Sequence, residues 1–373
     1  MTLSQEYTDI IMAENSVDIQ HGLSTEADVV LSHEAIVDKA IRLIKAGFTK
    51  DIEVELALSE MIGALADKCT VTMRTIAASV KEAHQQIDCN GLGKFIVPCE
   101  LTEGIYDFYK NGYDTGMEIS GWYDFSRLFR VAKRELTIVT GIPGHGKSEF
   151  VDDLMMGLMT KHYLKFGIFS PENYPHEIHI EKMLSKLYNK PFHKGRNDRL
   201  TEMEIAQGLN TLSSFVSFIV PDENDLSLDA ILAIALRIKK EKGLDFLLID
   251  PWNEIENNRD KAETETDYIG RSLMKCRRFA RKNDIAFFIV AHPLKMQKDK
   301  DGVRPVPTPY DISGSSHWFN KADNCLCVYR NIDTVDVHVQ KIKFKIRGQV
   351  GCASFKYDVV SGRYTEINKQ EEI

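Results

Sequence analysis

A strand that runs directly into a glycine-rich loop is the feature of this sequence that most constrains its fold. Residues 136–148 read LTIVTGIPGHGKS, which contains a complete G-x-x-x-x-G-K-S pattern from Gly141 to Ser148. Leu136 to Val139 predict the strand, and residues 149–159 predict the helix that must follow it. In this context the glycines let backbone N–H groups turn toward bound phosphates. The segment therefore predicts a nucleoside triphosphate site at the edge of an α/β sheet.

The residue types of this loop predict how a nucleotide is held. The phosphates are expected to lie against the loop and the start of its helix, formed by Gly141, Pro143, Gly144, His145, Gly146, Lys147, Ser148 and Glu149. Lys147 is expected to reach the terminal phosphates, and the Ser148 hydroxyl to bind Mg²⁺. ATP or another nucleoside triphosphate, together with Mg²⁺, is the predicted cofactor. The alternative is a glycine-rich turn that binds no ligand.

The composition of the 373 residues, 43% hydrophobic and 27% charged, is typical of a globular protein. No apolar run approaches the roughly 20 residues that a membrane span requires, and the N-terminus lacks the basic start and apolar core of a signal peptide. The seven cysteines never form C-x-x-C, which favours reduced thiols over a zinc ribbon. We therefore expect a cytoplasmic protein (the host cytoplasm if a phage encodes it) with no membrane partner.

The net charge of −8 is unevenly distributed along the chain. Residues 1–95 hold 8 Lys+Arg and 15 Asp+Glu, whereas residues 96–373 hold 39 and 40. The part that carries the phosphate loop is thus nearly neutral, and its basic residues are clustered. The overall charge therefore does not exclude a DNA-binding surface there.

Three segments are expected along the chain. Residues 1–90 have apolar residues at helical spacing and predict a small helical domain. Within it, residues 61–76 resemble a helix-turn-helix, but the acidic surroundings favour a simple helical hairpin. Residues 91–120 predict a linker that contains a short amphipathic segment, 101–112.

Residues 121–373 predict a RecA-like P-loop NTPase core. Strands alternate with helices in this region, which indicates an α/β fold with a mostly parallel sheet. The last two expected strands follow each other without a helix and predict a hairpin at one edge. The expected strands are 136–140, 166–170, 215–220, 246–250, 285–291, 324–329, 335–344 and 353–358.

Carboxylates follow two of the expected strands. Glu172 lies just beyond strand 166–170, at the sheet edge where ligands bind, and is a candidate general base that deprotonates the attacking water. The apolar run Phe246-Leu247-Leu248-Ile249 ends in Asp250, a pattern that predicts a Mg²⁺ ligand. Glu254, in the loop that follows, is a competing base candidate that we rank below Glu172.

Strand 285–291 ends in His292, which is a candidate contact to the γ-phosphate. A long basic loop follows it and is expected to bind a polyanion, although charged loops are often simply solvated. The candidate nucleic-acid-binding residues in this loop are Lys295, Lys298, Lys300 and Arg304. The helix before the strand carries a second basic face at Arg271, Lys275, Arg278 and Lys282, for which exposure to solvent is the favoured reading.

Residues 340–348, QKIKFKIRG, alternate basic and apolar residues. In a strand, alternate residues point to one face, so four cations would lie side by side and repel one another. This arrangement favours a role in contacting the phosphates of a neighbouring subunit, as an arginine finger does. The alternative is an edge strand that its lysines protect from aggregation.

These motifs, in this order, resemble ring-shaped replicative helicases of the DnaB/Twinkle type, over roughly residues 100–373. The resemblance rests on the phosphate loop together with Ser170-Pro171-Glu172-Asn173, Ile249-Asp250-Pro251-Trp252-Asn253, Ala291-His292-Pro293, Asp311-Ile312-Ser313-Gly314-Ser315, Lys321-Ala322-Asp323-Asn324 and the final basic segment. It is especially close to proteins in which such a helicase follows a primase module.

The resemblance implies a homo-hexameric ring with single-stranded DNA in its centre and nucleotide bound between subunits. It implies that Glu172 is the catalytic base and His292 a sensor of hydrolysis. The loops after Asp250 and His292 would contact DNA. Residues 101–112 would match the family's linker segment, which docks on the adjacent subunit.

The sequence departs from the family in two places. The family's finger arginine often stands in K-x-R-F, and here that register gives Lys341-Ile342-Lys343-Phe344. Arg347 stands four residues later in K-x-R-G form, so the finger is either Lys343 or Arg347; we favour Arg347 because guanidinium binds phosphate bidentately. Residues 1–95 contain nothing that resembles a primase, so a separate primase or loader is a possible partner.

Three functions are compatible with these motifs. The leading hypothesis is a 5′-to-3′-type replicative DNA helicase acting at a replication fork. The second is a recombination or repair ATPase that forms filaments on DNA. The third is a nucleotide-switched binding protein without motor activity, whose hydrolysis DNA would not stimulate.

Overall fold

A computed structural model describes residues 96, 98–195, 198–257, 259, 263–298, 304–314 and 316–367. The chain divides into two units, residues 1–113 and 114–373. The helical domain and helix-turn-helix alternative expected in residues 1–90 lie outside the described residues. Among the helices that the structure describes, none is long and apolar enough to cross a membrane.

The described part of the first unit is a short 3-10 turn, η3 (Pro98–Leu101), followed by helix α5 (Thr102–Asn111). The helix falls within the amphipathic segment expected at 101–112, and it ends where Gly112 adopts a φ of +78°. Its apolar side chains are exposed, Ile105 by 58% and Tyr109 by 86%. The helix thus has an exposed apolar surface.

The second unit is built on one nine-stranded sheet with the strand order β3-β2-β4-β5-β1-β6-β7-β8-β9. The first six strands of this order pair in parallel, and β6 to β9 pair antiparallel. The strands are β1 (Leu136–Thr140), β2 (Phe166–Phe169), β3 (Val216–Phe218), β4 (Phe246–Ile249), β5 (Ala286–Val290), β6 (Asn324–Arg330), β7 (Val335–Ile342), β8 (Gly351–Tyr357) and β9 (Tyr364–Glu366). The mostly parallel α/β sheet expected from the sequence is confirmed.

The expected hairpin is present, because β7 and β8 pair antiparallel, but β6 and β9 extend it to a meander of four strands. Strand β9, with three residues, is too short to show an alternating pattern in the sequence. One detail of the expected sheet is wrong. Strand β7 ends at Ile342, and the 3-10 turn η6 (Lys345–Arg347) follows soon after it. The basic segment 340–348 is therefore not one continuous strand.

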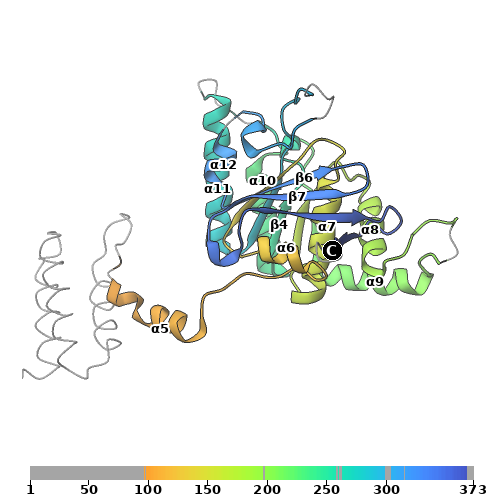
Figure 1. Cartoon of the computed structure of the whole chain (residues 1–373), viewed down its shortest axis with the longest axis horizontal. Coiled ribbons are helices and arrows are strands. Elements are labelled where there is room, and N and C mark those ends of the chain that lie inside the picture. Colours follow the sequence, from red (N-terminus) through yellow and green to blue (C-terminus); the bar gives the residue numbers. More distant parts are fainter. Residues whose placement is uncertain are drawn as a thin grey trace, which may run out of the picture. The chain divides into compact units, whose positions relative to one another are not determined.

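Helices cover both faces of the sheet and bury two separate cores (Figure 1). Alternation along β4 shows why: Phe246 and Leu248 enter one core, whereas Leu247 and Ile249 enter the other. One face packs against α6 (Tyr123–Leu128), α7 (Lys147–His162), α8 (His176–Tyr188) and α9 (Glu202–Phe215), and the other against α10 (Leu228–Glu241), α11 (Glu265–Asn283) and α12 (His317–Lys321). The short turns η4 (Trp252–Glu254) and η5 (Pro309–Asp311) lie in loops.

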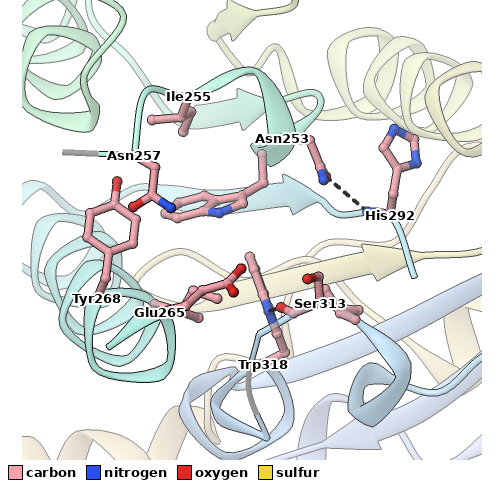
Figure 2. A pocket seen from close by; sticks show the side chains of 11 residues that line it. Asn253, Ile255, Asn257, Glu265, Tyr268, His292, Ser313 and Trp318 are labelled. Carbon is pink, nitrogen blue, oxygen red and sulfur yellow. Dashed lines mark hydrogen bonds between the residues drawn. The ribbon is translucent and has the colours of Figure 1, made fainter. Parts of the chain in front are cut away.

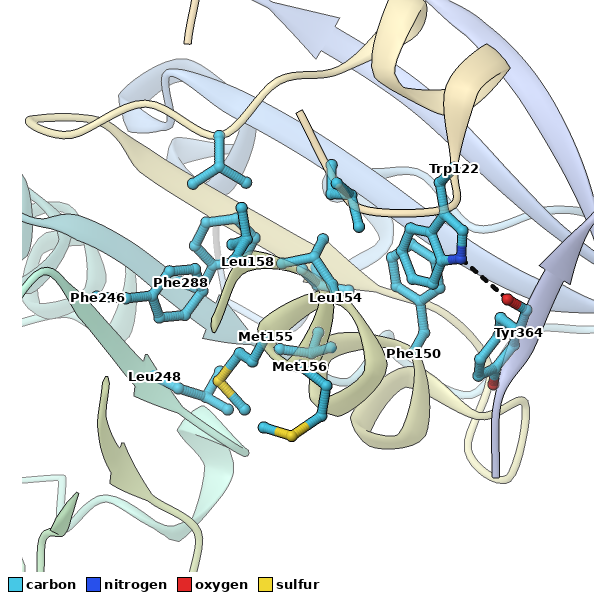
Figure 3. Close-up of a cluster of buried hydrophobic side chains, with 14 of the residues drawn as sticks. Trp122, Phe150, Leu154, Met155, Met156, Leu158, Phe246, Leu248, Phe288 and Tyr364 are labelled. Carbon is cyan, nitrogen blue, oxygen red and sulfur yellow. Dashed lines mark hydrogen bonds between the residues drawn. The ribbon is translucent and has the colours of Figure 1, made fainter. Parts of the chain in front are cut away.

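An aromatic cluster joins the start of this unit to the helix of the phosphate loop (Figure 3). Trp122 stacks on Phe150 of α7 with ring centroids 4.9 Å apart, and it meets Phe355 of β8 edge-on at 5.0 Å. Its indole N–H donates a hydrogen bond to the carbonyl oxygen of Tyr364, at 2.9 Å. Trp122 thereby connects the start and the end of the second unit around α7.

We predict that Trp122→Ala lowers the free energy of unfolding by about 3–5 kcal/mol, because it leaves a cavity and an unpaired carbonyl. Urea denaturation measures the loss. The neighbouring Tyr123 is exposed, so Tyr123→Ala is the matched control, with a change within about 0.5 kcal/mol. Equal losses in the two variants would contradict the role of this cluster.

Candidate active site

The phosphate loop connects β1 to α7 at the carboxyl edge of the parallel strands. Gly141 has a φ of +148°, and a Cβ at this position would lie 2.2 Å from the carbonyl oxygen of Val328 in β6. Only glycine therefore lets the loop approach β6 so closely. Helix α7 begins after Gly146 without a side-chain cap. Its first N–H groups are thus suited to hold an anion.

Lys147 lies inside this loop. Its ammonium group donates to the carbonyl oxygens of Gly141 (2.9 Å) and Ile142 (3.3 Å). Burial lowers the pKa of Lys147 to about 8, while the nearby charges of Asp250 and Glu172 act in the opposite direction. The predicted phosphate-binding lysine therefore lies beside both predicted carboxylates.

Asp250 is nearly fully buried at the end of β4. Burial raises the pKa of Asp250 to about 7, and a hydrogen bond from Ser148 opposes the rise. Among the described residues, Asp250 Oδ1 has no hydrogen-bond partner. A buried carboxylate with an open oxygen beside a serine hydroxyl is a donor set that suits Mg²⁺. Ser148 and Asp250 are therefore the residues of this site that could hold a metal ion.

Glu172 follows β2, and its side chain is 52% exposed. Its Oε1 lies 3.8 Å from Nε2 of His292, which follows β5. Burial and the charge of Lys147 lower the pKa of His292, against the opposing charge of Glu172. The structure thus brings the predicted base and the predicted sensor together. Glu254, the competing base, is exposed in η4.

A cavity of about 150 Å³ lies between the loops that follow β4 and β5 (Figure 2). Trp252 and Trp318 meet edge-on in its wall, with centroids 5.4 Å apart. Asn253, also in the wall, accepts a hydrogen bond from the backbone N–H of His292 at 3.4 Å. The loop after Asp250 is thereby connected to the residue expected to contact the γ-phosphate.

The predicted nucleic-acid-binding loop begins at the same edge of the sheet. Lys295, Lys298 and Arg304 are exposed, and Lys300 lies outside the described residues. The loop is anchored at its base, where Leu294 N–H donates to the carbonyl oxygen of Asp311 at 2.7 Å. The C-terminal part of the loop is anchored by Tyr329, whose hydroxyl donates to the carbonyl oxygen of Arg304 at 2.7 Å.

The two candidate fingers, Lys343 and Arg347, lie at the edge of the sheet formed by the amino ends of the parallel strands, opposite the phosphate loop. Ile342, at the end of β7, pairs with Asn324 at the start of β6, which runs parallel to β1. Lys343 forms an ion pair with buried Asp323 at 3.0 Å. Arg347 contacts buried Glu135, just before β1, and lies 3.5 Å from Asp114. Neither candidate shares an edge with the phosphate loop of its own chain.

The expected row of four exposed cations on one strand face is wrong. Lys341 is in β7, but its ammonium group donates to the carbonyl oxygens of Phe319 and Ala322. Lys345 and Arg347 are in the 3-10 turn η6. The repulsion that the alternating pattern implied is avoided because the strand ends and because Lys341, Lys343 and Arg347 each have a separate partner.

Two of the four cations on the basic face of α11 contact acidic neighbours. Arg271 pairs with Glu263 at 2.7 Å, and Lys275 contacts Asp229. The opposite side of the helix is fully buried through Leu273, Cys276 and Ala280, as its spacing predicts. This pattern supports the reading of a solvated face.

Residues from distant elements surround the phosphate loop, and none of them is marked in the sequence. The backbone N–H of Arg330 in β6 donates to Nδ1 of His145 at 2.9 Å, and the hydroxyl of Tyr364 in β9 donates to the carbonyl oxygen of Gly146 at 3.1 Å. Arg330 lies over the ring of Tyr357 at 5.3 Å. No local motif marks these residues, because the antiparallel meander brings them to the loop.

A layer of buried ion pairs between α7 and α8 was also missed. His179 Nε2 lies 3.0 Å from Asp152, and both side chains are buried. Lys186, with no exposed side-chain surface, lies 2.7 Å from Glu149. Regular spacing of charges on two helices offered a signal, since His179, Lys182 and Lys186 recur on one face of α8.

Asp336, His338 and Cys352 form a polar cluster on β7 and β8 whose ligand-type atoms lie within 4.8 Å of one another. Both Asp336 oxygens accept hydrogen bonds, from Ser354 at 2.7 Å and from Asn331 at 2.8 Å. These bonds connect β7 to β8 and to the preceding turn. The cluster therefore has a structural role in the sheet.

Comparison with known proteins identifies relatives of this chain. Residues 119–363 match the family described as the DnaB-like helicase C-terminal domain. The Twinkle homolog protein, chloroplastic/mitochondrial, of Arabidopsis thaliana is 35% identical over 69% of this chain and 37% of its own length. The replicative DNA helicase DnaC of Bacillus subtilis is 24% identical over 95% of this chain and 78% of its own length. The chain thus spans little more than a third of the plant protein.

Two solved structures share the fold. The first, an ATPase domain, is 17% identical, with a TM-score of 0.60 over 72% of this chain and 99% of that one. The second, a DnaB-like replicative helicase described with its interactions with primase, is 17% identical, with a TM-score of 0.59 over 90% of this chain and 77% of that one. These similarities confirm the predicted RecA-like core.

The His179–Asp152 pair predicts a pH-dependent stability. Burial lowers the pKa of His179, but the charge and hydrogen bond of Asp152 outweigh it and raise the pKa overall, with Asp250 adding to the rise and Lys182 opposing it. The pKa of Asp152 is lowered, because the charges of His179 and the nearby lysines outweigh its burial. The stabilisation by His179 is therefore complete below its unfolded pKa of about 6.5 and is lost as pH rises through the folded pKa.

We predict that His179→Gln lowers the free energy of unfolding by about 3–5 kcal/mol at pH 6 and by less at pH 9, as measured in urea. His193 is the matched control, because it pairs with Glu181 at the surface, and His193→Gln should cost less than about 1 kcal/mol at either pH. A loss from His179→Gln that stays constant between the two pH values would rule out a charged pair.

Proposed function

This chain belongs to the DnaB-like helicase C-terminal domain family, and we propose on that basis that it is a replicative DNA helicase: a ring motor that hydrolyses ATP, moves along single-stranded DNA and unwinds the duplex at a replication fork. The observation that carries this proposal is the division of the site between two sheet edges. Lys147, Asp250, Glu172 and His292 share one edge, whereas Arg347 lies at the other. Such a site is complete only where two subunits meet.

The carboxyl edge supplies the groups that hydrolysis needs. Mg²⁺, held by Ser148 and Asp250, would neutralise charge on the β- and γ-phosphates. Lys147 binds the terminal phosphates, and Glu172 accepts the proton of the attacking water at a carboxylate oxygen. His292 contacts the γ-phosphate and passes its state, through the Asn253 hydrogen bond, to the loop after β4. Hydrolysis is thereby coupled to the loops that face DNA.

The amino edge supplies the finger in trans. Arg347 remains the favoured residue, because its guanidinium matches a phosphate bidentately. Its contact with Asp114, which is 73% exposed, is the weaker of its two ion pairs and is the one that a phosphate can replace. Lys343 is the alternative, and its partner Asp323 is buried.

Single-stranded DNA is the proposed polyanion, bound by Lys295, Lys298, Lys300 and Arg304. Their loop begins directly after His292-Pro293 and is anchored at the carboxyl edge of the sheet. Phosphate contacts of this kind are independent of sequence and weaken with salt, which suits a motor that moves along any strand.

The assembly that we propose is a homo-hexamer. The exposed apolar face of α5 would dock on the adjacent subunit, with residues 91–120 as linker, residues 1–90 as a helical domain and residues 121–373 as the ATPase domain. A primase or loader would be a separate partner, since one relative is described with primase. The protein would work in the cytoplasm, on the DNA of its cell or host; its A. thaliana relative is named as chloroplastic/mitochondrial.

The proposed function predicts strand separation of a forked duplex in ATP and Mg²⁺. The Lys147→Ala variant should show none, because it loses the phosphate-binding ammonium group. Gel-based unwinding measures both, with a magnesium chelator as a second blank. ATP hydrolysis stimulated by single strands but without unwinding would instead favour a filament-forming ATPase or a helicase that needs a loader. Hydrolysis that DNA does not stimulate would favour a nucleotide-switched binding protein.

A finger that acts in trans predicts rescue on mixing. Arg347→Ala and Glu172→Gln should each lose ATP hydrolysis, but mixed rings should regain part of it, because a site can combine Glu172 of one subunit with Arg347 of the next. The control mixture, Lys147→Ala with Glu172→Gln, should stay inactive, since both defects lie on the same side of every interface. Rescue by Lys343→Ala in place of Arg347→Ala would move the finger to Lys343.

A further inference from the structure

The turn that carries Glu172 is held by its neighbours and not by Glu172 itself. The Glu172 side chain is half exposed, and its contact with His292 is long, at 3.8 Å. One residue later, the Asn173 side chain donates to the hydroxyl of Ser170 at 2.9 Å. The Asn173 backbone N–H also donates to the carbonyl oxygen of Ser170, at 3.3 Å. The position of the proposed base is therefore set by the Ser170–Asn173 turn.

Lys182 of α8 connects this turn to the phosphate-loop helix. Its ammonium group donates to Oδ1 of Asn173 at 3.1 Å and lies 3.0 Å from Oε1 of Glu149. Glu149 follows Ser148 directly in the sequence. A chain of short contacts thus runs from α7, through Lys182, to the residue beside Glu172.

The far end of this chain is rigid. The second oxygen of Glu149 lies 2.7 Å from the ammonium group of Lys186, which has no exposed side-chain surface. Lys186 also donates to the carbonyl oxygen of Gly362. Each carboxylate oxygen of Glu149 contacts one lysine, Lys182 or Lys186. Lys186 thus fixes the position of Glu149, and Lys182 joins Glu149 to Asn173. Burial lowers the pKa of Lys182, but Glu149 outweighs it and raises the pKa overall, so the ammonium group stays charged.

We propose that Lys182 is a positioning residue, which sets the distance between Glu172 and the phosphate loop by joining Asn173 to Glu149. This inference rests on the proposed role of Glu172 as the base. A catalytic group displaced by about 1 Å can lose on the order of a hundredfold in rate. The two oxygens that Lys182 contacts belong to Asn173 and Glu149, so we expect its effect to fall on kcat through the position of Glu172.

The first test is ATP hydrolysis by Lys182→Met. Its kcat should fall about ten- to hundredfold, while the KM for ATP and the affinity for a non-hydrolysable ATP analogue change less than about twofold, since the phosphate loop is intact. Lys182→Arg keeps a donor that can bridge the same two oxygens and should recover most of the rate. A parallel loss of nucleotide affinity in Lys182→Met would show a merely structural role.

Lys190 offers the matched control. It lies just beyond the end of α8 and forms an ion pair of the same length, 3.0 Å, with Glu204, away from the Glu172 turn. Lys190→Met should leave kcat unchanged, whereas an equal fall in both methionine variants would overturn the inference.

Asn173→Ala tests the same link from its other end and serves if Lys182→Met does not fold. It should lower kcat like Lys182→Met, and the double variant should be no slower than the slower single variant, because both changes break one connection. Fully multiplicative losses would mean that the two residues act separately.

The Glu172→Gln background separates this inference from the proposed function. With the base removed, Lys182→Met should not slow the residual hydrolysis further. Near-normal hydrolysis by Glu172→Gln alone would refute the proposed base, whatever Lys182 does. An inactive Glu172→Gln together with a wild-type rate for Lys182→Met would overturn only the positioning role.

Discussion

Parallel pairing of β1 with its neighbours is the constraint on which the rest of this structure depends. Strands β4, β5, β1 and β6 lie side by side and run in one direction, so their carboxyl ends meet at one edge. Asp250, His292 and the phosphate loop follow three of these ends. Residues separated by about a hundred positions in sequence thereby share one site. The close approach of Gly141 to Val328 fixes the loop against this edge.

The antiparallel meander brings further residues to both edges of the parallel strands. Strand β6 ends beside the phosphate loop, where Arg330 contacts His145, and β7 then returns to the opposite edge. Arg347 is thereby carried away from the phosphate loop of its own chain and toward Glu135. The sheet thus separates the phosphate loop from the proposed finger, which is the arrangement that the proposed ring of identical subunits requires.

The ion pairs between α7 and α8 carry a desolvation cost, and their position suggests what they contribute in return. Removing charged groups from water is expensive, and an apolar interface is often at least as stable. Ion pairs and hydrogen bonds, however, hold their partners in one geometry. The pairs formed by Asp152 with His179 and by Glu149 with Lys182 and Lys186 lie directly behind the phosphate loop. Of these residues, Lys182 reaches the Glu172 turn through Asn173, and the proposed value of its pair with Glu149 is in fixing the distance between the loop and that turn.

The sequence by itself determined the α/β core and the edge that carries the nucleotide, because those features follow from local patterns. Two patterns can be recognised without a structure. They are the apolar runs that end in Asp250 or His292 and the glycine spacing from Gly141 to Gly146. Arg330 and Tyr364 carry no local signal, and the helical spacing of Lys182 does not show its partners, since such a side chain acquires a role only from the atoms that it meets. The alternating basic segment misled for the same reason: pattern alone could not show that β7 ends at Ile342. Tertiary structure decided which side chains share an edge, because strand order is set by packing between segments that are distant in the chain.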